Sequence, residues 1–176
     1  MASFAERMIG AAKLDVHIYE EIEADRTAMG QAMTVVVLSS VAAGIGSMNG
    51  GFRGLVAVSL ASLAGWFVWG WLTYLIGTKL LPEAGTKADA GELLRTIGFS
   101  SAPGVLRILG IIPFLRGPLF FAVSIWMLAS MIVAVRQALD YTSTIRAVGV
   151  CVIGWVVYVV FAVLITMAFG AGGAAG

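Results

Sequence analysis

Few residues of this sequence combine the type and the spacing that chemistry requires. The only histidine, His17, is accompanied by no set of ligands at the spacing of a metal site. The single cysteine, Cys151, lies inside an apolar run, which predicts a packing residue and no disulfide. Glycine-rich phosphate motifs are absent, and no pair of acidic residues falls inside an apolar run. The sequence therefore predicts a protein that is not an enzyme and that binds no metal or cofactor.

The segment before the first apolar run has the pattern of an amphipathic helix. One face of its helical wheel is apolar and gathers Phe4, Met8, Ala11, Ile18, Tyr19 and Ile22. Such a helix lies at the membrane surface or against the other helices. Asp15 falls within the apolar face, where it either caps a second helix or is a buried acid paired with a basic residue. The pattern favours the cap.

The second half of this segment is acidic, with four carboxylates between positions 20 and 25. Anionic lipids would repel such a surface. A protein partner, or the basic connectors of the same chain, is a better counterpart. Four residues are therefore candidate interaction or structural residues: Asp15, Tyr19, Glu23 and Asp25.

The third apolar run, residues 93–112, is interrupted by the stretch GFSSAPG at residues 98–104. Small residues let helices approach closely, and a proline at mid-span removes a backbone hydrogen bond and kinks the helix. The pattern predicts a bent, close-packed helix in which Gly98 and Pro103 are the important residues. The alternative is a hinge or a polar pocket on a transport path.

A polar connector, residues 136–146, follows the fourth apolar run. Arg136 and Asp140 are four residues apart, so on a helix they can pair on one face. Asp140 could instead cap the next helix or bond Arg146. Together with Tyr141, this cluster either fixes how the fourth and fifth spans meet or forms a docking surface for a cytoplasmic partner.

The composition indicates what kind of structural elements position these residues. Of 176 residues, 60% are hydrophobic and 12% are charged, whereas soluble domains carry about 25% charged residues. One globular core of this size cannot bury so much apolar surface, but a lipid bilayer can accommodate it. The net charge is +1 with no basic tract, which argues against nucleic acid as a partner.

Five apolar runs approach the length needed to cross a bilayer core about 30 Å thick. They lie near residues 28–45, 55–80, 93–112, 119–135 and 147–169. Helices are expected because barrel strands would be about ten residues of alternating polarity, and because a helix satisfies its own backbone groups inside lipid. We therefore expect an all-α polytopic membrane protein with five transmembrane helices and an amphipathic N-terminal helix.

The chain is expected to divide into a cytoplasmic N-terminal segment (1–26), a five-helix transmembrane domain (27–170) and a flexible Gly/Ala tail (171–176). Basic residues set the orientation. Eight lie in the N-terminal segment and in the second and fourth connectors: Arg7, Lys13, Arg26, Lys79, Lys87, Arg95, Arg136 and Arg146. The opposite side holds three: Arg53, Arg107 and Arg116. This division places the N-terminus in the cytoplasm and, after five spans, the C-terminus outside.

Three segments, taken in order, resemble bacterial members of the Yip1 family. The first is YEEIEAD at residues 19–25, and the second is LRTIGF at residues 94–99, which leads into APG at residues 102–104. The third is Trp126 followed by AVRQALDY at residues 134–141. The resemblance extends from about Asp15 to Leu164, and its specificity lies in the order of the segments.

The resemblance implies a five-helix membrane bundle with a cytoplasmic N-terminus, in a bacterial cytoplasmic (inner) membrane. Eukaryotic relatives act in vesicle trafficking and membrane shaping and bind prenylated small GTPases. The short segment before the first span does not favour that GTPase-binding role here. The family implies no catalytic residue.

We expect a non-enzymatic protein that organises membrane or protein assemblies. Its expected partners are the lipid bilayer and other membrane proteins or a second copy of the chain. Two alternatives stay open. One is a small-solute transporter or permeation pathway that uses the break at Ser100, Ser101 and Pro103, and the other is an accessory subunit of a larger membrane complex.

Overall fold

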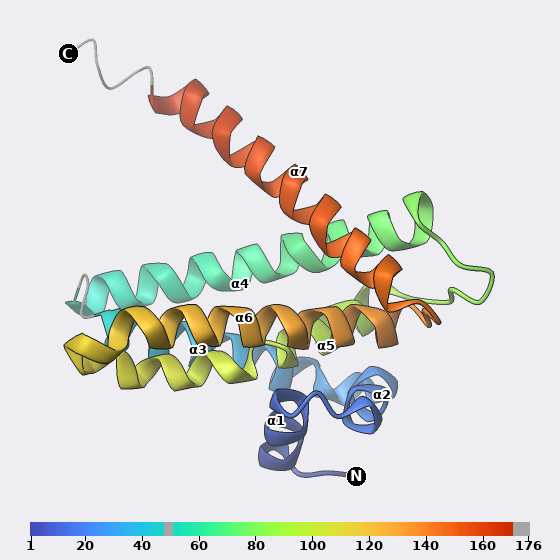
Figure 1. Cartoon of the computed structure of the whole chain (residues 1–176), viewed down its shortest axis with the longest axis horizontal. Coiled ribbons are helices and arrows are strands. Elements are labelled where there is room, and N and C mark those ends of the chain that lie inside the picture. The colour runs from blue at the N-terminus through green and yellow to red at the C-terminus, as the bar shows by residue number, and fades with distance from the viewer. Residues whose placement is uncertain (48–50, 171–176) are drawn as a thin grey trace.

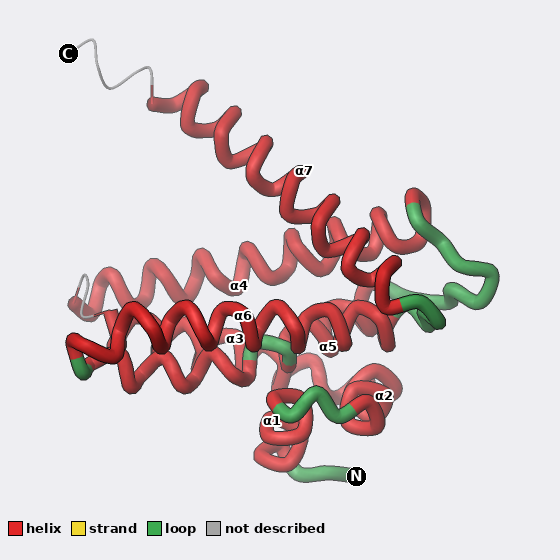
Figure 2. Tube along the Cα trace, viewed as in Figure 1, coloured by secondary structure: helices red, strands yellow, loops and turns green. Residues whose placement is uncertain are grey.

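The structure, a computed structural model, describes residues 1–47 and 51–170, with side chains up to residue 160. Every regular element within these ranges is a helix, as predicted (Figure 2). The predicted Gly/Ala tail, 171–176, lies outside the described residues. Among the described residues, three helical stretches are long and apolar enough to cross a bilayer: Arg26–Ser47, Gly51–Leu80 and Pro113–Ala138. One shorter apolar helix, Thr144–Val160, accompanies them.

Two short helices precede the first long one. They are α1 (Phe4–Ala12) and α2 (Val16–Ala24), and they lie side by side against the rest of the molecule (Figure 1). Asp15 is exposed and caps α2, because its carboxylate accepts a hydrogen bond of 3.0 Å from the backbone N–H of His17. The prediction that Asp15 is a helix cap rather than a buried acid is confirmed.

Each of the first two long helices is extended at one end by a short turn of a different helical type. A short 3₁₀ turn, η1 (Arg26–Ala28), leads into α3 (Met29–Ser47). The second, α4 (Gly51–Leu75), continues into one π-helical turn, η2 (Ile76–Leu80). Both carry apolar side chains on all sides rather than on one stripe, which is the pattern of helices surrounded by lipid and by other helices.

The third predicted span is two helices rather than one bent helix. α5 (Ala90–Phe99) ends at Ser100, and the chain continues as a 3₁₀ helix, η3 (Ala102–Ile111). Pro103 lies in the first turn of η3, where its missing N–H has no helical acceptor to lose. A proline also disfavours α geometry in the preceding residue, which is Ala102. The expected bend is therefore a change from α-helical to 3₁₀ geometry.

The last two helices are longer than the apolar runs that predicted them. α6 (Pro113–Ala138) begins with a proline in its first turn, where proline is tolerated, and it includes Pro118. α7 (Thr144–Gly170) follows a short connector. In Figure 1, α7 leaves the other helices at an angle, so that its end lies far from α6.

Glycines allow α5 and η3 to run along α3 in the same direction. A Cβ atom added at Gly98 would lie 2.7 Å from the Cβ atom of Ala32, so only glycine permits this approach. Further along, a Cβ at Gly104 would collide with the Ser39 side chain. The prediction that Gly98 marks a close-packed helix is confirmed.

The buried core lies toward the end of the molecule that carries α1 and α2. It forms where α2, the start of α3, α5 and the end of α6 meet. Four side chains of this core, from α2, α5 and the end of α6, are fully buried: Tyr19, Leu93, Phe99 and Leu139. The N-terminal segment is thus part of the folded bundle and covers its helices, rather than standing apart from them.

Candidate functional site

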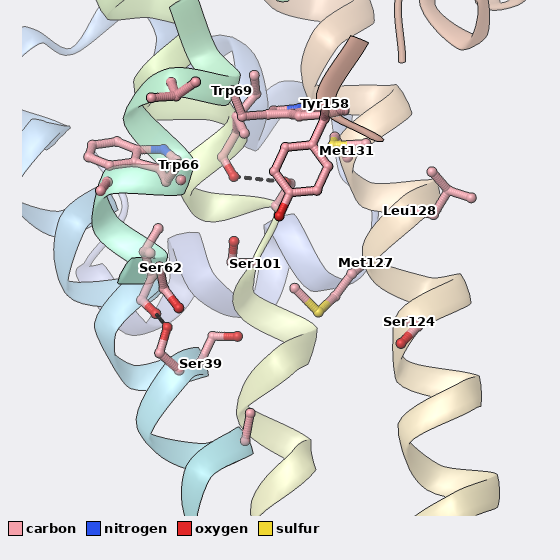
Figure 3. A pocket seen from close by; sticks show the side chains of 18 of the residues that line it. Ser39, Ser62, Trp66, Trp69, Ser101, Ser124, Met127, Leu128, Met131 and Tyr158 are labelled. Carbon is pink, nitrogen blue, oxygen red and sulfur yellow. Dashed lines mark hydrogen bonds between the residues drawn. The ribbon is translucent and has the colours of Figure 1, made fainter. Parts of the chain in front are cut away.

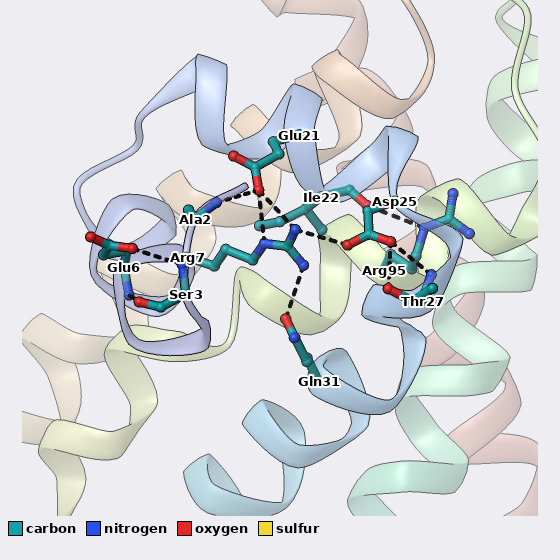
Figure 4. A network of polar contacts seen from close by, with 10 residues as sticks. All are labelled: Ala2, Ser3, Glu6, Arg7, Glu21, Ile22, Asp25, Thr27, Gln31 and Arg95. Atoms are coloured by element: carbon teal, nitrogen blue, oxygen red, sulfur yellow. Dashed lines mark hydrogen bonds and ion pairs between the residues drawn. The ribbon is translucent and has the colours of Figure 1, made fainter.

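Arg7, in α1, is the centre of a buried polar network (Figure 4). Its guanidinium donates hydrogen bonds to Glu21 Oε1 at 2.8 Å and to Gln31 Oε1 at 3.0 Å. It also forms an ion pair of 2.8 Å with the carboxylate of Asp25. Burial disfavours the charge, but the two carboxylates outweigh that effect and raise the pKa of Arg7 above its usual value. One side chain therefore joins α1, α2 and the start of α3.

Asp25, a predicted interaction residue, ends α2 and begins η1. Its carboxylate accepts hydrogen bonds from the Thr27 backbone N–H at 2.9 Å and from the Thr27 hydroxyl at 2.6 Å. The hydrogen bonds from Thr27 and Arg7 lower the pKa of Asp25 to about 2. With 9% of its surface exposed, Asp25 has a structural role and offers little to a partner.

Arg95, from α5, secures the other side of α2. Its guanidinium donates to the backbone carbonyl of Ile22 at 3.2 Å and to that of Glu23. The last carbonyls of a helix have no partner within it, and a cation there satisfies them and the helix dipole. Arg95 is 4% exposed, so the contact between α2 and α5 is an integral part of the core.

Tyr19 is also structural. It is fully buried, and its hydroxyl donates a hydrogen bond of 3.2 Å to the Ala11 carbonyl. Burial raises the pKa of the Tyr19 phenol, so the side chain stays neutral. The residue ties α2 back to α1, and its hydroxyl is not available to a ligand.

An open polar pocket of about 480 Å³ lies between α2 and the end of α6. It is lined by Val16, Glu20, Glu23, Arg136, Gln137, Asp140, Tyr141 and Thr142. The amide of Gln137 donates to Glu20 Oε1 at 3.2 Å, which links the two walls. Burial, and then the neighbouring carboxylate of Asp140, raise the pKa of Glu23 to about 7. We call this pocket the acidic pocket.

The residues of the predicted Arg136–Asp140 cluster meet, but not through the expected pair. α6 ends at Ala138, and Asp140 has a φ of 52°, so the two side chains do not share a helical face. Arg136 instead donates to the carbonyl of Tyr141 at 3.2 Å. Among the described residues, Asp140 neither caps the next helix nor bonds Arg146. It is exposed at the rim of the acidic pocket.

Tyr141 and Glu83 hold the connector after α6 against the connector after η2. The Tyr141 hydroxyl lies 2.7 Å from the Leu81 carbonyl and 2.9 Å from the Gly77 carbonyl. Glu83 accepts hydrogen bonds from the backbone N–H and hydroxyl of Thr142, at 2.9 and 2.8 Å. Of the two predicted roles for this cluster, the structural one accounts for Tyr141.

A second, larger cavity lies among the long helices (Figure 3). This apolar cleft, of about 980 Å³, is lined by side chains of α3, α4, α5, η3, α6 and α7 and by Ser100 and Ser101 between α5 and η3. Ser100 and Ser101 line it, but the Ser100 hydroxyl already donates to the Ile97 carbonyl at 2.7 Å. Pro103 is buried and is not part of the lining. The break therefore forms part of the wall of the cleft.

Sequence reasoning missed the two buried arginines as structural centres. Arg7 gives a signal, because it lies three residues after Phe4 and four before Ala11, within the apolar stripe of α1. Arg95 lies in a run of buried residues of α5 and carries a similar signal. A charged residue on an apolar face predicts a buried partner, which the sequence does not name.

Comparison with known proteins agrees with this architecture. The model of the Yip1 domain matches residues 17–165, which extends from α2 well into α7. No curated protein and no solved structure matches the chain. The match includes the acidic pocket, the α5–η3 break and the apolar cleft, and it accounts for far more than half of the 176 residues. The chain therefore belongs to the Yip1 domain family, whose members are non-enzymatic, multi-pass membrane proteins.

Proposed function

We propose that this protein organises membrane-protein assemblies by docking a basic segment of a partner protein in the acidic pocket. The proposal rests on one observation: the carboxylates of Glu20, Glu23 and Asp140 line the same open pocket, one wall of which is the rigidly held helix α2. This helix is rigidly held because Arg7 and Arg95 fix α2 to α3 and α5. A preorganised surface loses little conformational entropy when a partner binds.

The membrane arrangement that goes with this proposal has five spans. The fourth and fifth are α6 and α7, and the third is α5 followed by η3. Ten α-helical residues rise about 15 Å and ten 3₁₀ residues about 20 Å, which together suffice for a core about 30 Å thick. Residues 1–26 then lie in the cytoplasm of a bacterial cell, and the C-terminus lies outside.

Contacts at one end of the bundle support this orientation. α1 and α2 lie beside the start of α5 and the end of α6, and the connectors after η2 and α6 meet through Glu83 and Thr142. All ten acidic residues lie in these segments: Glu6, Asp15, Glu20, Glu21, Glu23, Asp25, Glu83, Asp89, Glu92 and Asp140. The eight basic residues counted above lie there too, which is the cytoplasmic side by the positive-inside rule.

A protein is a better occupant of the acidic pocket than a lipid. The cytoplasmic leaflet is negatively charged, and it would repel the carboxylates of Glu20 and Asp140. Arg136, a basic residue of the lining, donates a hydrogen bond to the Tyr141 carbonyl. Lysine or arginine side chains near the cytoplasmic ends of other membrane proteins have the complementary charge.

The experiment compares partner recovery between two variants that lose the same charge. Glu20→Gln with Asp140→Asn neutralises the rim of the pocket, and asparagine tolerates the positive φ at position 140. Glu6→Gln with Asp89→Asn is the matched control, because neither residue lines the pocket. Glutamine and asparagine can also keep the helix-capping roles of these two positions. Each variant is extracted in mild detergent, and co-purifying proteins are identified by mass spectrometry.

We expect the pocket variant to lose a specific membrane protein that the wild type and the control recover. A photo-reactive residue at Gln137 should cross-link to a basic segment of that protein. Recovery of the same proteins by both variants would contradict the proposal. Solute flux through the purified protein in liposomes would instead support the transporter alternative.

A further inference from the structure

One residue that lines the apolar cleft is charged and has no counter-ion among the described residues. Arg107, in η3, lines the cleft together with Trp69 of α4 and Ser124 of α6. Its Nη2 donates to the Ser124 hydroxyl at 2.8 Å, and its guanidinium carbon lies 5.4 Å from the centre of the Phe120 ring. Its Nε is buried and has no hydrogen-bond partner among the described residues. Within the same residues, no carboxylate pairs with it.

In the five-span arrangement proposed above, Arg107 lies in the third span, where an ionisable side chain is costly and points to a functional site. The Arg107 carbonyl lies against Gly46, next to the last residue of α3, so the backbone is near the end of the bundle opposite α1 and α2. The side chain reaches Ser124, one turn of α6 deeper than Phe120. The Phe120 ring and the Ser124 hydroxyl reduce the cost of burying the guanidinium charge, but they do not neutralise it. An anion bound in the cleft would neutralise this charge.

The cleft also contains a second buried donor, the indole N–H of Trp69, which has no partner in the part of the chain that the structure describes. The indole N–H of Trp66, by contrast, donates to the Leu94 carbonyl at 3.0 Å. Trp69 packs edge-on against Tyr158 of α7, with ring centres 6.4 Å apart (Figure 3). A buried unpaired donor carries a desolvation cost that a ligand acceptor would remove.

The size and lining of the cleft fit a chain-like amphiphile. Its volume of about 980 Å³ lies at the upper end of the roughly 300–1,000 Å³ of small-molecule sites. The walls are mostly apolar and include Leu72, Met127, Leu128 and Met131. Methionine side chains adapt to flexible ligands.

We propose that this cleft binds an anionic phospholipid of the surrounding bilayer, with its phosphate on Arg107 and one acyl chain along α4 and α6. An acyl chain is already in an apolar medium before it binds, so its transfer into the cleft contributes little. Preference must therefore come from the headgroup charge. This makes Arg107 the residue that determines specificity. The proposal does not depend on the docking role of the acidic pocket.

Native mass spectrometry of the full chain in detergent tests this site. Dioleoyl phosphatidylglycerol is compared with dioleoylglycerol, which has the same acyl chains but no phosphate. A charge-assisted hydrogen bond corresponds to a preference on the order of tenfold for the anionic lipid. Glycerol phosphate, which carries the charge without chains, should not displace the bound lipid.

Substitutions at two positions separate the headgroup contact from the space for the acyl chain. Arg107→Gln should abolish the preference, and Arg107→Lys should keep part of it, because lysine retains the charge without the planar fork. Gly65→Leu projects into open space in the cleft, since a Cβ there meets no atom within 4 Å. It should weaken binding of both lipids several-fold. Gly30→Leu is its control, because that position is equally open and does not line the cleft.

Three outcomes would overturn the proposal. They are an unchanged preference in Arg107→Gln, unchanged lipid binding in Gly65→Leu, and a cleft occupied by a second copy of the chain, seen as a dimer that anionic lipid does not affect. Glu20→Gln with Asp140→Asn should bind lipid as the wild type does, which keeps the two proposals distinguishable. Circular dichroism of each variant shows whether it has folded.

Discussion

The guanidinium of Arg7 lies 2.8 Å from the carboxylate of Asp25, and this ion pair ties the first helix of the chain to the entrance of the first long one. Both side chains are buried, with 2% and 9% of their surfaces exposed. A buried pair of this kind is a poor source of net stability, yet the loss of one partner leaves an uncompensated charge. The N-terminal helices should therefore be sensitive to single substitutions far from the long helices.

Arg7→Met should lower the free energy of unfolding by about 2–3 kcal/mol, because it leaves Asp25 buried without its partner. Partial exposure of Glu21, at 30% of its side chain, limits the loss, since water screens that carboxylate. Unfolding of the purified protein in mixed micelles, followed by circular dichroism, measures the change. Limited proteolysis should cut residues 1–24 faster in the variant.

Two further variants test whether the ion pair is the cause. Lys13→Met removes an exposed basic residue at the end of α1 and should leave unfolding unchanged. Adding Asp25→Asn to Arg7→Met should recover part of the stability, because it removes the unpaired charge. Equal losses in Lys13→Met and Arg7→Met would show that α1 is not fixed by this network.

The free energy of unfolding should fall as the pH rises from about 4.5 to about 7, because of the raised pKa of Glu23. Burial and the neighbouring Asp140 raise its folded-state pKa from 4.5 to about 7, so the folded state keeps a proton that the unfolded state releases. The favourable contribution is complete below pH 4.5 and is lost as the pH passes through the raised value. The side chain is only half-buried, and screening by water reduces the effect to on the order of 1 kcal/mol.

Glu23→Gln should flatten this part of the pH profile, because glutamine does not titrate. Unfolding measured at pH 5, 6 and 7 in the same detergent gives the slope for each protein. The lowered pKa of Asp25 acts in the opposite direction and only at lower pH, so it does not contribute in this window. A slope that persists in Glu23→Gln would assign the titration to another group.

Tyr141→Phe should cost about 1–2 kcal/mol, because it removes a buried hydroxyl that bonds the carbonyls of Gly77 and Leu81. Tyr158→Phe is the matched control, since that side chain is 56% exposed and forms no hydrogen bond through its hydroxyl among the described residues. Unfolding in mixed micelles compares the two. Similar losses would mean that Tyr141 contributes through its ring and not through the connector contact.

The long helices were predictable because their composition reports directly on the surrounding solvent. Apolar runs of about 20 residues define α3 and α4 closely. Asp15 was predictable as a cap because aspartate inside an apolar stripe competes for backbone N–H groups. The change from α5 to η3 was not predictable in kind, since Pro103 disfavours an α-helix but does not specify which geometry replaces it.

The long-range polar contacts could not be predicted from the sequence. Arg7 and Asp25 are 18 positions apart, and Arg95 lies about 70 residues after its acceptors, Ile22 and Glu23. Local spacing suggested an Arg136–Asp140 pair, but the left-handed backbone at Asp140 moves its carboxylate off the helix. Tertiary packing decides such pairs, and a single sequence does not encode it in any local pattern.

The approach of Gly98 to Ala32 should make the α5–α3 contact intolerant of a single methyl group. A Cβ at position 98 would lie 2.7 Å from the Ala32 Cβ and 3.2 Å from its backbone, which cannot move aside as a flexible side chain can. Gly98→Ala should therefore destabilise the protein by about 1–3 kcal/mol, the usual cost of overpacking.

Gly65→Ala, in α4, adds the same methyl group where no atom lies within 4 Å and should change stability by less than about 0.5 kcal/mol. Unfolding of both variants in mixed micelles measures the difference, and Ala32→Gly combined with Gly98→Ala should restore part of the loss. Equal stability of Gly98→Ala and Gly65→Ala would show that α5 and α3 are further apart than their glycine contact indicates.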